Sequence, residues 1–319
     1  MKRRYGLESI FYSRRVFILK ISLIAAGAII LFLLCFFLVR LVGNKFFNTD
    51  SVTYLYDNWD LRTIEGYSNV YDSSARMLDE DPFHNTALTF HGYSSFMLAE
   101  SETDPTKSQS YLDEAIVCLR NSLKDCKKDS LAQIQYMLGR SYFYKNKLSS
   151  YHYYSDLVIK YLNLSLENGY SSDDIPLLLG LSYASIGDTD KSIAAFTEAL
   201  LVRENDTLLF NIAKQYFNNQ QESVAKQYLF RVIETSSNED LVNSSHILLG
   251  QIFTEEGNYD EAEKEFDSIL LVHDNNADAH YAKGLLYEKK GDSVKARAEW
   301  RKCLKIQSRH AGALKKIER

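Results

Sequence analysis

The last third of the chain repeats itself with a fixed period, and this period restricts the possible folds more than any other feature of the sequence. Between Asn243 and His310, five landmark residues each recur 34 positions later. The five pairs are Gly250 with Gly284, Phe253 with Tyr287, Gly257 with Gly291, Ala262 with Ala296, and Phe266 with Trp300. A strict period of this length is typical of stacked supersecondary units, none of which buries its apolar face alone. The period therefore predicts a solenoid in which each unit packs on the next.

Each unit is predicted to contain two amphipathic helices joined by a turn that contains Gly. Gly250 and Ala262 are expected where the two helices cross, because only a very small side chain lets the two backbones approach closely. Phe253 and Phe266 would fill the space around this contact. The unit is thus predicted to be a helical hairpin closed by aromatic side chains.

The ends of these helices are also marked in the sequence. Gly257 follows the first helix and is predicted to end it, and Asp260 is placed as the cap of the second helix. The arrangement resembles the tetratricopeptide repeat (TPR), whose pattern has Leu-Gly, then Tyr, Gly, Ala and Phe at these offsets. The matching residues are Leu249, Gly250, Phe253, Gly257, Ala262 and Phe266. The resemblance implies helical hairpins throughout and a function in binding other proteins.

The same pattern continues less regularly toward the N-terminus. From residue 51 we expect a degenerate first unit, about six repeats, and a C-terminal capping helix over residues 311–319. In the unit that starts at Asn85, the run Ser101–Ser110 is expected to lengthen the turn between the helices. The expected fold class is therefore all-α: a TPR helical-hairpin solenoid over residues 51–319, after one N-terminal transmembrane helix.

The N-terminal segment has the composition of a membrane anchor. No charged residue lies between Ile21 and Val39, and the apolar segment extends to 16–42, which is long enough to span a bilayer as a helix. A cleaved signal peptide is the alternative, but its apolar region would be shorter and would end at small residues. We therefore expect a basic cytoplasmic tail at 1–15, a transmembrane helix at 16–42 and a linker at 43–50.

The distribution of charge predicts the orientation of this anchor. Six Lys or Arg residues precede the span and two follow it closely, and an excess of basic residues marks the cytoplasmic side. Residues 1–49 carry eight basic and one acidic residue, whereas the remainder carries 29 basic and 41 acidic residues, a net charge of about −12. We expect the repeat domain on the periplasmic side of the inner (cytoplasmic) membrane. A domain this acidic is not expected to bind nucleic acid.

The sequence contains none of the common catalytic or cofactor-binding motifs. It has no GxxxxGK[ST] phosphate loop, no HExxH, no GxSxG, and no GxGxxG after a strand. His246 and His280 share the position of the first large aromatic residue of the TPR pattern, which favours packing or a groove edge over metal binding. Cys118 and Cys126 are either free thiols or a local disulfide. We therefore expect no enzymatic activity, no metal and no cofactor.

A solenoid of helical hairpins offers a binding surface on the concave face formed by its first helices. The groove residues are those that the repeat register does not direct at the partner helix. The predicted partner-binding groove consists of Tyr93, Tyr136, Arg140, Phe143, Tyr144, Phe210, Lys214, Phe217, Gln251, Thr254, Tyr281 and Glu288. Aromatic residues with Arg and Lys suit a peptide segment or a helix of another protein. The alternative for any one of them is packing between adjacent repeats.

The positions that hold C-terminal carboxylates in TPR co-chaperones do not carry the required Lys, Asn and Arg set. Those positions are occupied by Thr89, Tyr93, Met137 and Asn211. Two functions remain. One is a membrane-anchored scaffold that holds components of an envelope assembly, such as a secretion, envelope-biogenesis or motility machine. The other is a chaperone-like client binder beside a protein translocon, and a cytoplasm-facing adaptor is a weaker third.

Overall fold

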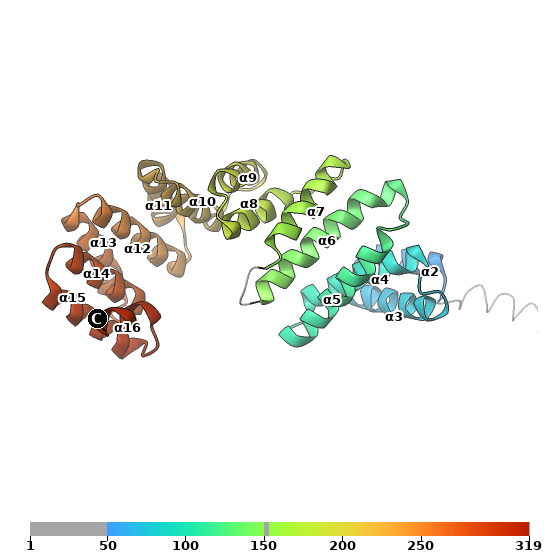
Figure 1. The fold of residues 1–319 in the computed structure, drawn as a ribbon, viewed down its shortest axis with the longest axis horizontal. Helices are drawn as coiled ribbons and strands as arrows, with labels where there is room; N and C mark the ends of the chain where they lie inside the picture. Colours follow the sequence, from blue (N-terminus) through green and yellow to red (C-terminus); the bar gives the residue numbers. More distant parts are fainter. Residues whose placement is uncertain (1–49, 150–152, 319) are drawn as a thin grey trace, which may run out of the picture. The chain divides into compact units, whose positions relative to one another are not determined.

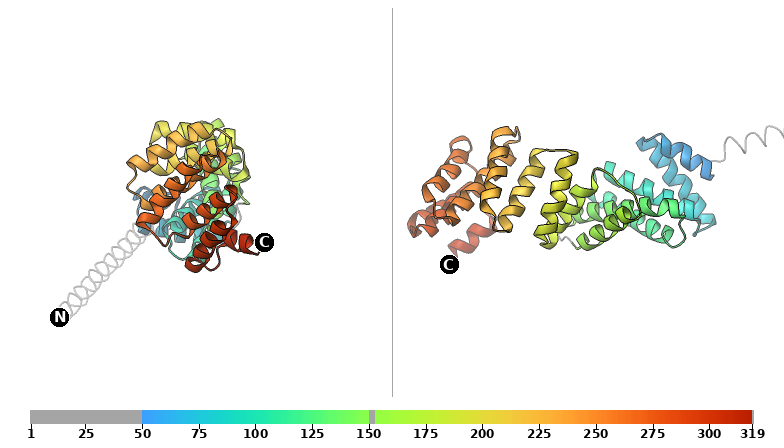
Figure 2. Two further views of the ribbon diagram at one scale, coloured as in Figure 1. Left: turned by 90° about the vertical axis from the view of Figure 1, so that its left-hand side faces the viewer. Right: turned by 90° about the horizontal axis from the view of Figure 1, so that it is seen from above.

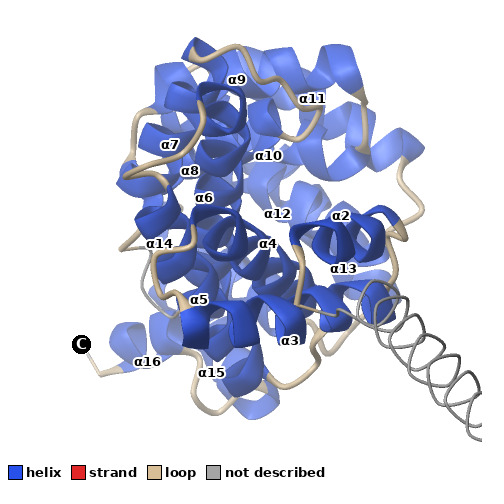
Figure 3. Ribbon diagram, turned by 90° about the vertical axis from the view of Figure 1, so that its right-hand side faces the viewer, coloured by secondary structure: helices blue, strands red, loops and turns tan. Residues whose placement is uncertain are grey.

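The computed structural model describes residues 50–149 and 153–318. In these ranges the chain forms α-helices and no β-strand (Figure 3). The helices are α2 (Val52–Asp60), α3 (Ile64–Glu80), α4 (Asn85–Ser101), α5 (Pro105–Ser122), α6 (Lys128–Leu148), α7 (Ser155–Glu167), α8 (Ile175–Ile186), α9 (Thr189–Val202), α10 (Asp206–Asn218), α11 (Glu222–Thr235), α12 (Glu239–Glu255), α13 (Tyr259–Val272), α14 (Ala277–Lys289), α15 (Ser293–Ile306) and α16 (Ala311–Ile317). The expected all-α fold class is confirmed for the described part of the chain.

The described residues divide into two compact units, and the division falls within α4, between Leu98 and Ala99. In the first unit, α2 and α3 form a hairpin that the start of α4 follows. Ser51 and Thr63 cap α2 and α3 by accepting hydrogen bonds from backbone N–H groups of the first turn. Leu55 and Val70 are fully buried in its core.

The second unit is a series of hairpins that follow one another in chain order: α6–α7, α8–α9, α10–α11, α12–α13 and α14–α15 (Figures 1 and 2). Helix α5 precedes them and α16 follows them. In each hairpin the even-numbered helix comes first, and the first helices of successive hairpins pack on one another: α6 on α8, α10 on α12, and α12 on α14. The expected solenoid of helical hairpins is confirmed.

Gly250 lies at the crossing of α12 and α13, as predicted, but its neighbour across the crossing is Phe266. A side-chain carbon placed on Gly250 of α12 would lie 2.5 Å from the Phe266 ring of α13, so the ring occupies the space that a side chain would need. Ala262 and Phe266 are fully buried and belong to one core cluster, which also includes Ala282 and Leu286 of α14. In the next hairpin the indole of Trp300 covers Gly284 in the same way. In both hairpins the glycine of the first helix therefore contacts the aromatic ring of the second helix.

Gly257 ends α12 as predicted, with a φ of +80° that favours glycine. The backbone N–H of Asn258 then donates to the carbonyl oxygen of Phe253 at 2.8 Å. The prediction that Asp260 caps α13 is wrong, because the N-cap is Asn258 and Asp260 lies in the first turn. Because the single left-handed residue Gly257 is enough to reverse the chain, α13 begins at Tyr259, earlier than predicted. At its actual position Asp260 places negative charge near the positive end of the helix dipole.

The turn between α4 and α5 is shorter than expected. The prediction of a long turn over Ser101–Ser110 is wrong, since α5 begins at Pro105. The Asp104 side chain accepts a hydrogen bond from the Thr106 N–H at 2.8 Å, and proline at the first helical position already has a helical φ. This local capping starts a helix within a polar run.

Helix α16 covers the apolar end of the last hairpin, which is the place expected for the capping helix. It packs against Trp300 and Cys303 and buries Ala313. His310 caps it, because its Nδ1 accepts a hydrogen bond from the Ala313 N–H at 3.1 Å. Lys315 in its last turn faces the negative end of the helix dipole.

The predicted anchor lies outside the described residues. The tail at 1–15, the transmembrane helix at 16–42 and the linker at 43–50, apart from Asp50, all precede them. Among the helices from α2 to α16, none combines the length and the apolar character needed to cross a bilayer.

Candidate functional site

Three successive first helices of the second unit enclose a cavity of about 390 Å³. Helix α10 contributes Phe210, Lys214 and Phe217, α12 contributes Gln251, and α14 contributes Tyr281. All five are residues of the predicted groove, although they come from a stretch of some 70 residues. We call this space the α10–α14 cavity.

A second cavity of about 450 Å³ adjoins the first. Phe143 and Lys147 of α6, Leu181 of α8, and Lys214 and Asn218 of α10 are among its lining residues. We call it the α6–α10 cavity. Lys214 and Asn218 line both cavities, so the two spaces meet at α10. Together they form the inner groove, which runs over the first helices from α6 to α14.

Three residues of the predicted groove form a closed polar cluster instead. Arg140 of α6 lies between the rings of Tyr136 and Tyr144, at 5.7 and 5.9 Å from their centroids. Its guanidinium makes ion pairs with Glu100 at 3.2 Å and Asp174 at 3.5 Å. The hydroxyl of Tyr144 donates to Glu100 at 2.6 Å, and that of Tyr136 donates to Asp174 at 2.8 Å. The cluster ties α6 to the end of α4 and to the start of α8.

The pKa shifts in this cluster agree with its partial burial. Burial raises the pKa of the Tyr136 hydroxyl. Burial alone would lower the pKa of the Arg140 guanidinium, but Tyr136, Glu100 and Asp174 outweigh it and raise that pKa. The charges and hydroxyls of the cluster are therefore already paired within the chain, between α6 and the neighbouring helices.

Three further predicted groove residues have partners within the chain. Tyr93 lies in the first unit, where it is buried and its ring packs 5.5 Å from that of Trp59. Thr254 is buried, and its hydroxyl donates to the Gly250 carbonyl oxygen at 2.7 Å. Glu288 is exposed and makes an ion pair with Lys316 of α16. The inner groove therefore includes six of the twelve predicted residues, counting Phe143.

The sequence reasoning missed several residues of the inner groove. Asn218 lies one turn after Lys214, Ile247 one turn before Gln251, and Asp278 one turn before Tyr281. A spacing of three or four residues places side chains on the same face of a helix. Extending each predicted residue by one turn would have found them.

The histidines of the last two hairpins pair with carboxylates. Nδ1 of His246 lies 2.7 Å from Glu265, and Nδ1 of His280 lies 2.6 Å from Glu299, so the pair itself recurs with the repeat. Among the described residues, no group of three or more His, Cys, Asp or Glu has a geometry suited to a metal ion. These histidines thus link the two helices of a hairpin.

The described cysteines, Cys118, Cys126 and Cys303, are free thiols. Burial raises the pKa of Cys118 and of Cys303 to about 11 in each case. Thiols with a raised pKa are weak nucleophiles, because the thiolate is the reactive form.

The comparison with protein families agrees with this geometry. A tetratricopeptide repeat-like domain matches residues 205–317, and a tetratricopeptide repeat matches residues 177–206. Residues 177–317 thus match tetratricopeptide repeat models. The matched stretch contains most of α8 and all of α9 to α16, and hence the residues of the α10–α14 cavity.

Solved TPR structures resemble the chain as a fold. The C-terminal part of a TPR repeat-containing protein from Cytophaga hutchinsonii is 11% identical over 84% of this chain and 99% of that one, with a TM-score of 0.55. YrrB, described as a TPR protein with an unusual peptide-binding site, is 22% identical over 63% of this chain and 98% of its own, with a TM-score of 0.45. MamA is 18% identical over 57% and 95%, with a TM-score of 0.45. The comparison with curated proteins finds no match.

Proposed function

We propose that this chain is a non-catalytic, membrane-anchored scaffold whose TPR domain holds protein partners in the inner groove. The groove itself supports the proposal best, since aromatic rings and Lys214 line two adjoining cavities of about 450 and 390 Å³. Aromatic side chains in such hollows are typical anchors of protein interfaces. TPR domains are in general interaction modules without catalytic activity.

The proposal includes a location. The apolar segment 16–42 anchors the chain in the inner membrane, and the basic excess before it keeps the N-terminus in the cytoplasm. The TPR domain then faces the periplasm, where it holds components of an envelope assembly such as a secretion, envelope-biogenesis or motility machine. A scaffold of this kind keeps its partners close to the membrane.

The test removes one aromatic ring from each cavity, in the double variant Phe143→Ala with Phe217→Ala. Truncation of an interface anchor costs about 2 kcal/mol or more, so the variant should bind its partners at least about tenfold more weakly. The measurement is in-cell crosslinking, followed by pull-down of the detergent-solubilised protein. Phe230→Ala is the matched control, because Phe230 is 44% exposed on α11 and lies outside the groove.

The helix content and membrane insertion of the double variant should match those of the wild type. An unaltered set of crosslinked partners in a folded variant would show that binding uses another surface. Partners recovered in fixed stoichiometry support a scaffold, whereas many weakly held and exchanging clients would favour a chaperone-like function beside a translocon.

A further inference from the structure

The charges in the inner groove are mainly positive. Lys147 and Lys214 are exposed and both line the α6–α10 cavity, and none of the described residues around that cavity is acidic. In the α10–α14 cavity the acidic residue is Asp278, which accepts a hydrogen bond from His310 Nε2 at 3.1 Å. By contrast Lys145, two residues before Lys147, makes an ion pair with Asp113.

These lysines stand out against the rest of the chain. Beyond residue 49, acidic residues outnumber basic ones, 41 to 29. A local positive charge in a hollow of an acidic domain attracts negatively charged segments and disfavours positively charged ones. The groove is therefore electrostatically suited to a partner segment that carries carboxylates.

Side-chain amides indicate the conformation of that segment. Asn211 and Asn218 of α10 and Gln251 of α12 all line the groove. An amide both donates and accepts hydrogen bonds, and the backbone of an extended chain offers both N–H and C=O groups. A helix has already paired these groups internally, except at its ends. Amides along the groove thus favour an extended occupant.

The dimensions of the groove give the length of the occupant. Packed helices lie about 8–10 Å apart. Three of the four steps from α6 to α14 join packed helices, and α8 and α10 are less closely packed, so the path is at least about 32–40 Å long. An extended chain rises about 3.3–3.6 Å per residue, and about 10–12 residues would cross this distance. Phe143 lies at the α6 end of the path and Tyr281 at the α14 end, while Phe217 of α10 lies near its middle.

We infer that the inner groove takes an extended acidic segment of a partner protein, about 10–12 residues long, whose carboxylates lie at Lys147 and Lys214 and whose apolar residues contact the aromatic rings at either end. This inference rests on the proposed function and specifies the chemistry of the partner.

The test uses two fluorescein-labelled 12-residue peptides and the full-length protein in detergent. The acidic probe has Phe and Leu at both ends and four Asp or Glu in the middle, and the basic probe has Lys at those four positions. Fluorescence anisotropy should show the acidic probe binding at least about tenfold more tightly. The difference in affinity between the two probes should become smaller in 1 M salt, because the screening length falls to about 3 Å.

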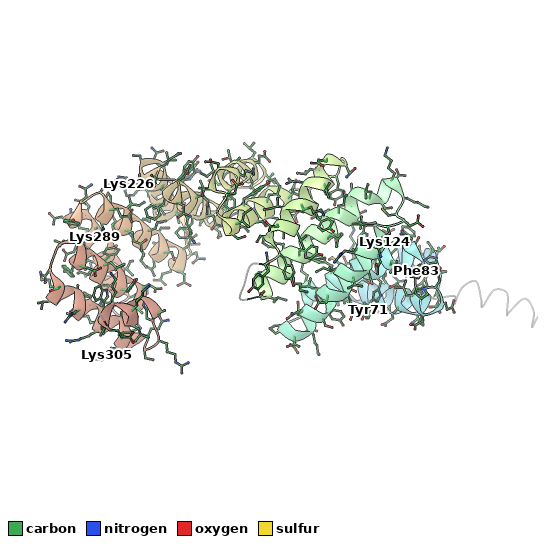
Figure 4. The ribbon with its side chains drawn as sticks, viewed as in Figure 1. Tyr71, Phe83, Lys124, Lys226, Lys289 and Lys305 are labelled. Atoms are coloured by element: carbon green, nitrogen blue, oxygen red, sulfur yellow. The ribbon has the colours of Figure 1, made fainter. Side chains whose placement is uncertain are left out.

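Charge reversal assigns the effect to the groove. The double variant Lys147→Glu with Lys214→Glu should weaken binding of the acidic probe about tenfold and strengthen binding of the basic probe. The matched control is Lys289→Glu with Lys305→Glu, which makes the same change of charge at two exposed lysines that line neither cavity (Figure 4). This control should bind both probes as the wild type does.

Equal affinity of the wild type for the two probes would overturn the inference. An equal loss of affinity for the acidic probe in the Lys147→Glu, Lys214→Glu variant and in the control would also overturn it. Failure here can be told apart from failure of the proposed function. If the Phe143→Ala, Phe217→Ala variant loses its crosslinked partners while the lysine variant keeps its affinity for the acidic probe, the groove binds partners of another chemistry. If neither variant has an effect, the groove is not the binding surface.

Discussion

In the hairpins α8–α9, α12–α13 and α14–α15, an aromatic ring that lies on a glycine is the contact that sets how closely the two helices approach. Gly250 with Phe266 and Gly284 with Trp300 are two copies of this contact. Interiors are packed as densely as organic crystals, so an added side chain at such a crossing has no free space. The consequences can be measured one residue at a time.

Ala262→Leu adds three heavy atoms at a fully buried position of α13. Overpacking of this kind typically costs about 1–3 kcal/mol, so we expect a lower free energy of unfolding. Thermal or denaturant unfolding of the full chain in detergent measures it. Ala194→Leu, at an exposed position of α9, should leave the stability nearly unchanged. A wild-type unfolding curve for Ala262→Leu would show that the register is wrong.

Glu299 gives a prediction for acidic pH. It is 8% exposed and lies 2.6 Å from His280 and 2.8 Å from Lys302. Burial alone would raise the pKa of its carboxyl, but these two partners outweigh burial and lower the pKa below the ordinary value of 4.5. A lowered folded-state pKa stabilises the fold above pH 4.5, and this contribution is lost as the pH falls through the folded-state pKa.

The variant Glu299→Gln removes this titration and keeps the shape of the side chain. The wild type should be more stable than the variant at pH 7, and the difference should shrink as the pH falls from 5 to 3. Unfolding in denaturant over this pH series is the measurement. A difference in the free energy of unfolding that stays constant with pH would mean that the negative charge of Glu299 does not stabilise the fold.

At the scale of the helix, the ends of the first helices follow one rule. Gly187, Gly257 and Gly291 all have φ near +80° just after a first helix. Gln220 occupies the same position after α10, with φ of +57°. In each case the next N–H bonds back into the helix, as Gln221 does to the Tyr216 carbonyl oxygen at 2.9 Å. The backbone geometry therefore persists where the sequence departs from the repeat.

Gln220→Gly should stabilise the protein. A left-handed conformation costs a residue with a side chain about 1–2 kcal/mol, while glycine loses more freedom on folding, about 0.5–1 kcal/mol. The expected gain is about 0.5–1 kcal/mol in the free energy of unfolding. Gly257→Ala, where an added carbon would meet no neighbour, should lose stability for the same reason. Changes with the opposite signs would show that the two turns are not equivalent.

At the scale of the whole molecule, the orientation of the proposed anchor decides on which side of the membrane the groove lies. The basic excess before residues 16–42 predicts a cytoplasmic N-terminus. A reporter fused after Arg319 should therefore behave as extracytoplasmic, for instance as active alkaline phosphatase. Strong activity of a reporter that works only in the cytoplasm would reverse the proposed orientation and favour the adaptor.

The sequence by itself determined the repeat, the small residues at the helix crossings and the glycine that ends α8, α12 and α14. These features depend on helical spacing and on the local space around a small residue, both of which a period of 34 displays directly. It also led to Phe210, Lys214, Phe217, Gln251 and Tyr281 as residues of one groove.

Only the tertiary structure decided which inward-facing side chains already have a hydrogen-bond or ion-pair partner within the chain. Arg140 and Tyr144 have the same spacing and chemistry as the groove residues, yet they pair with Glu100, 40 and 44 residues earlier in the chain. Pairing across repeats depends on how neighbouring helices are placed, because an ion pair requires its charged atoms within a few ångströms of each other. The cavities likewise form between three to five packed helices. The spacing of residues within one helix does not predict how these helices are placed.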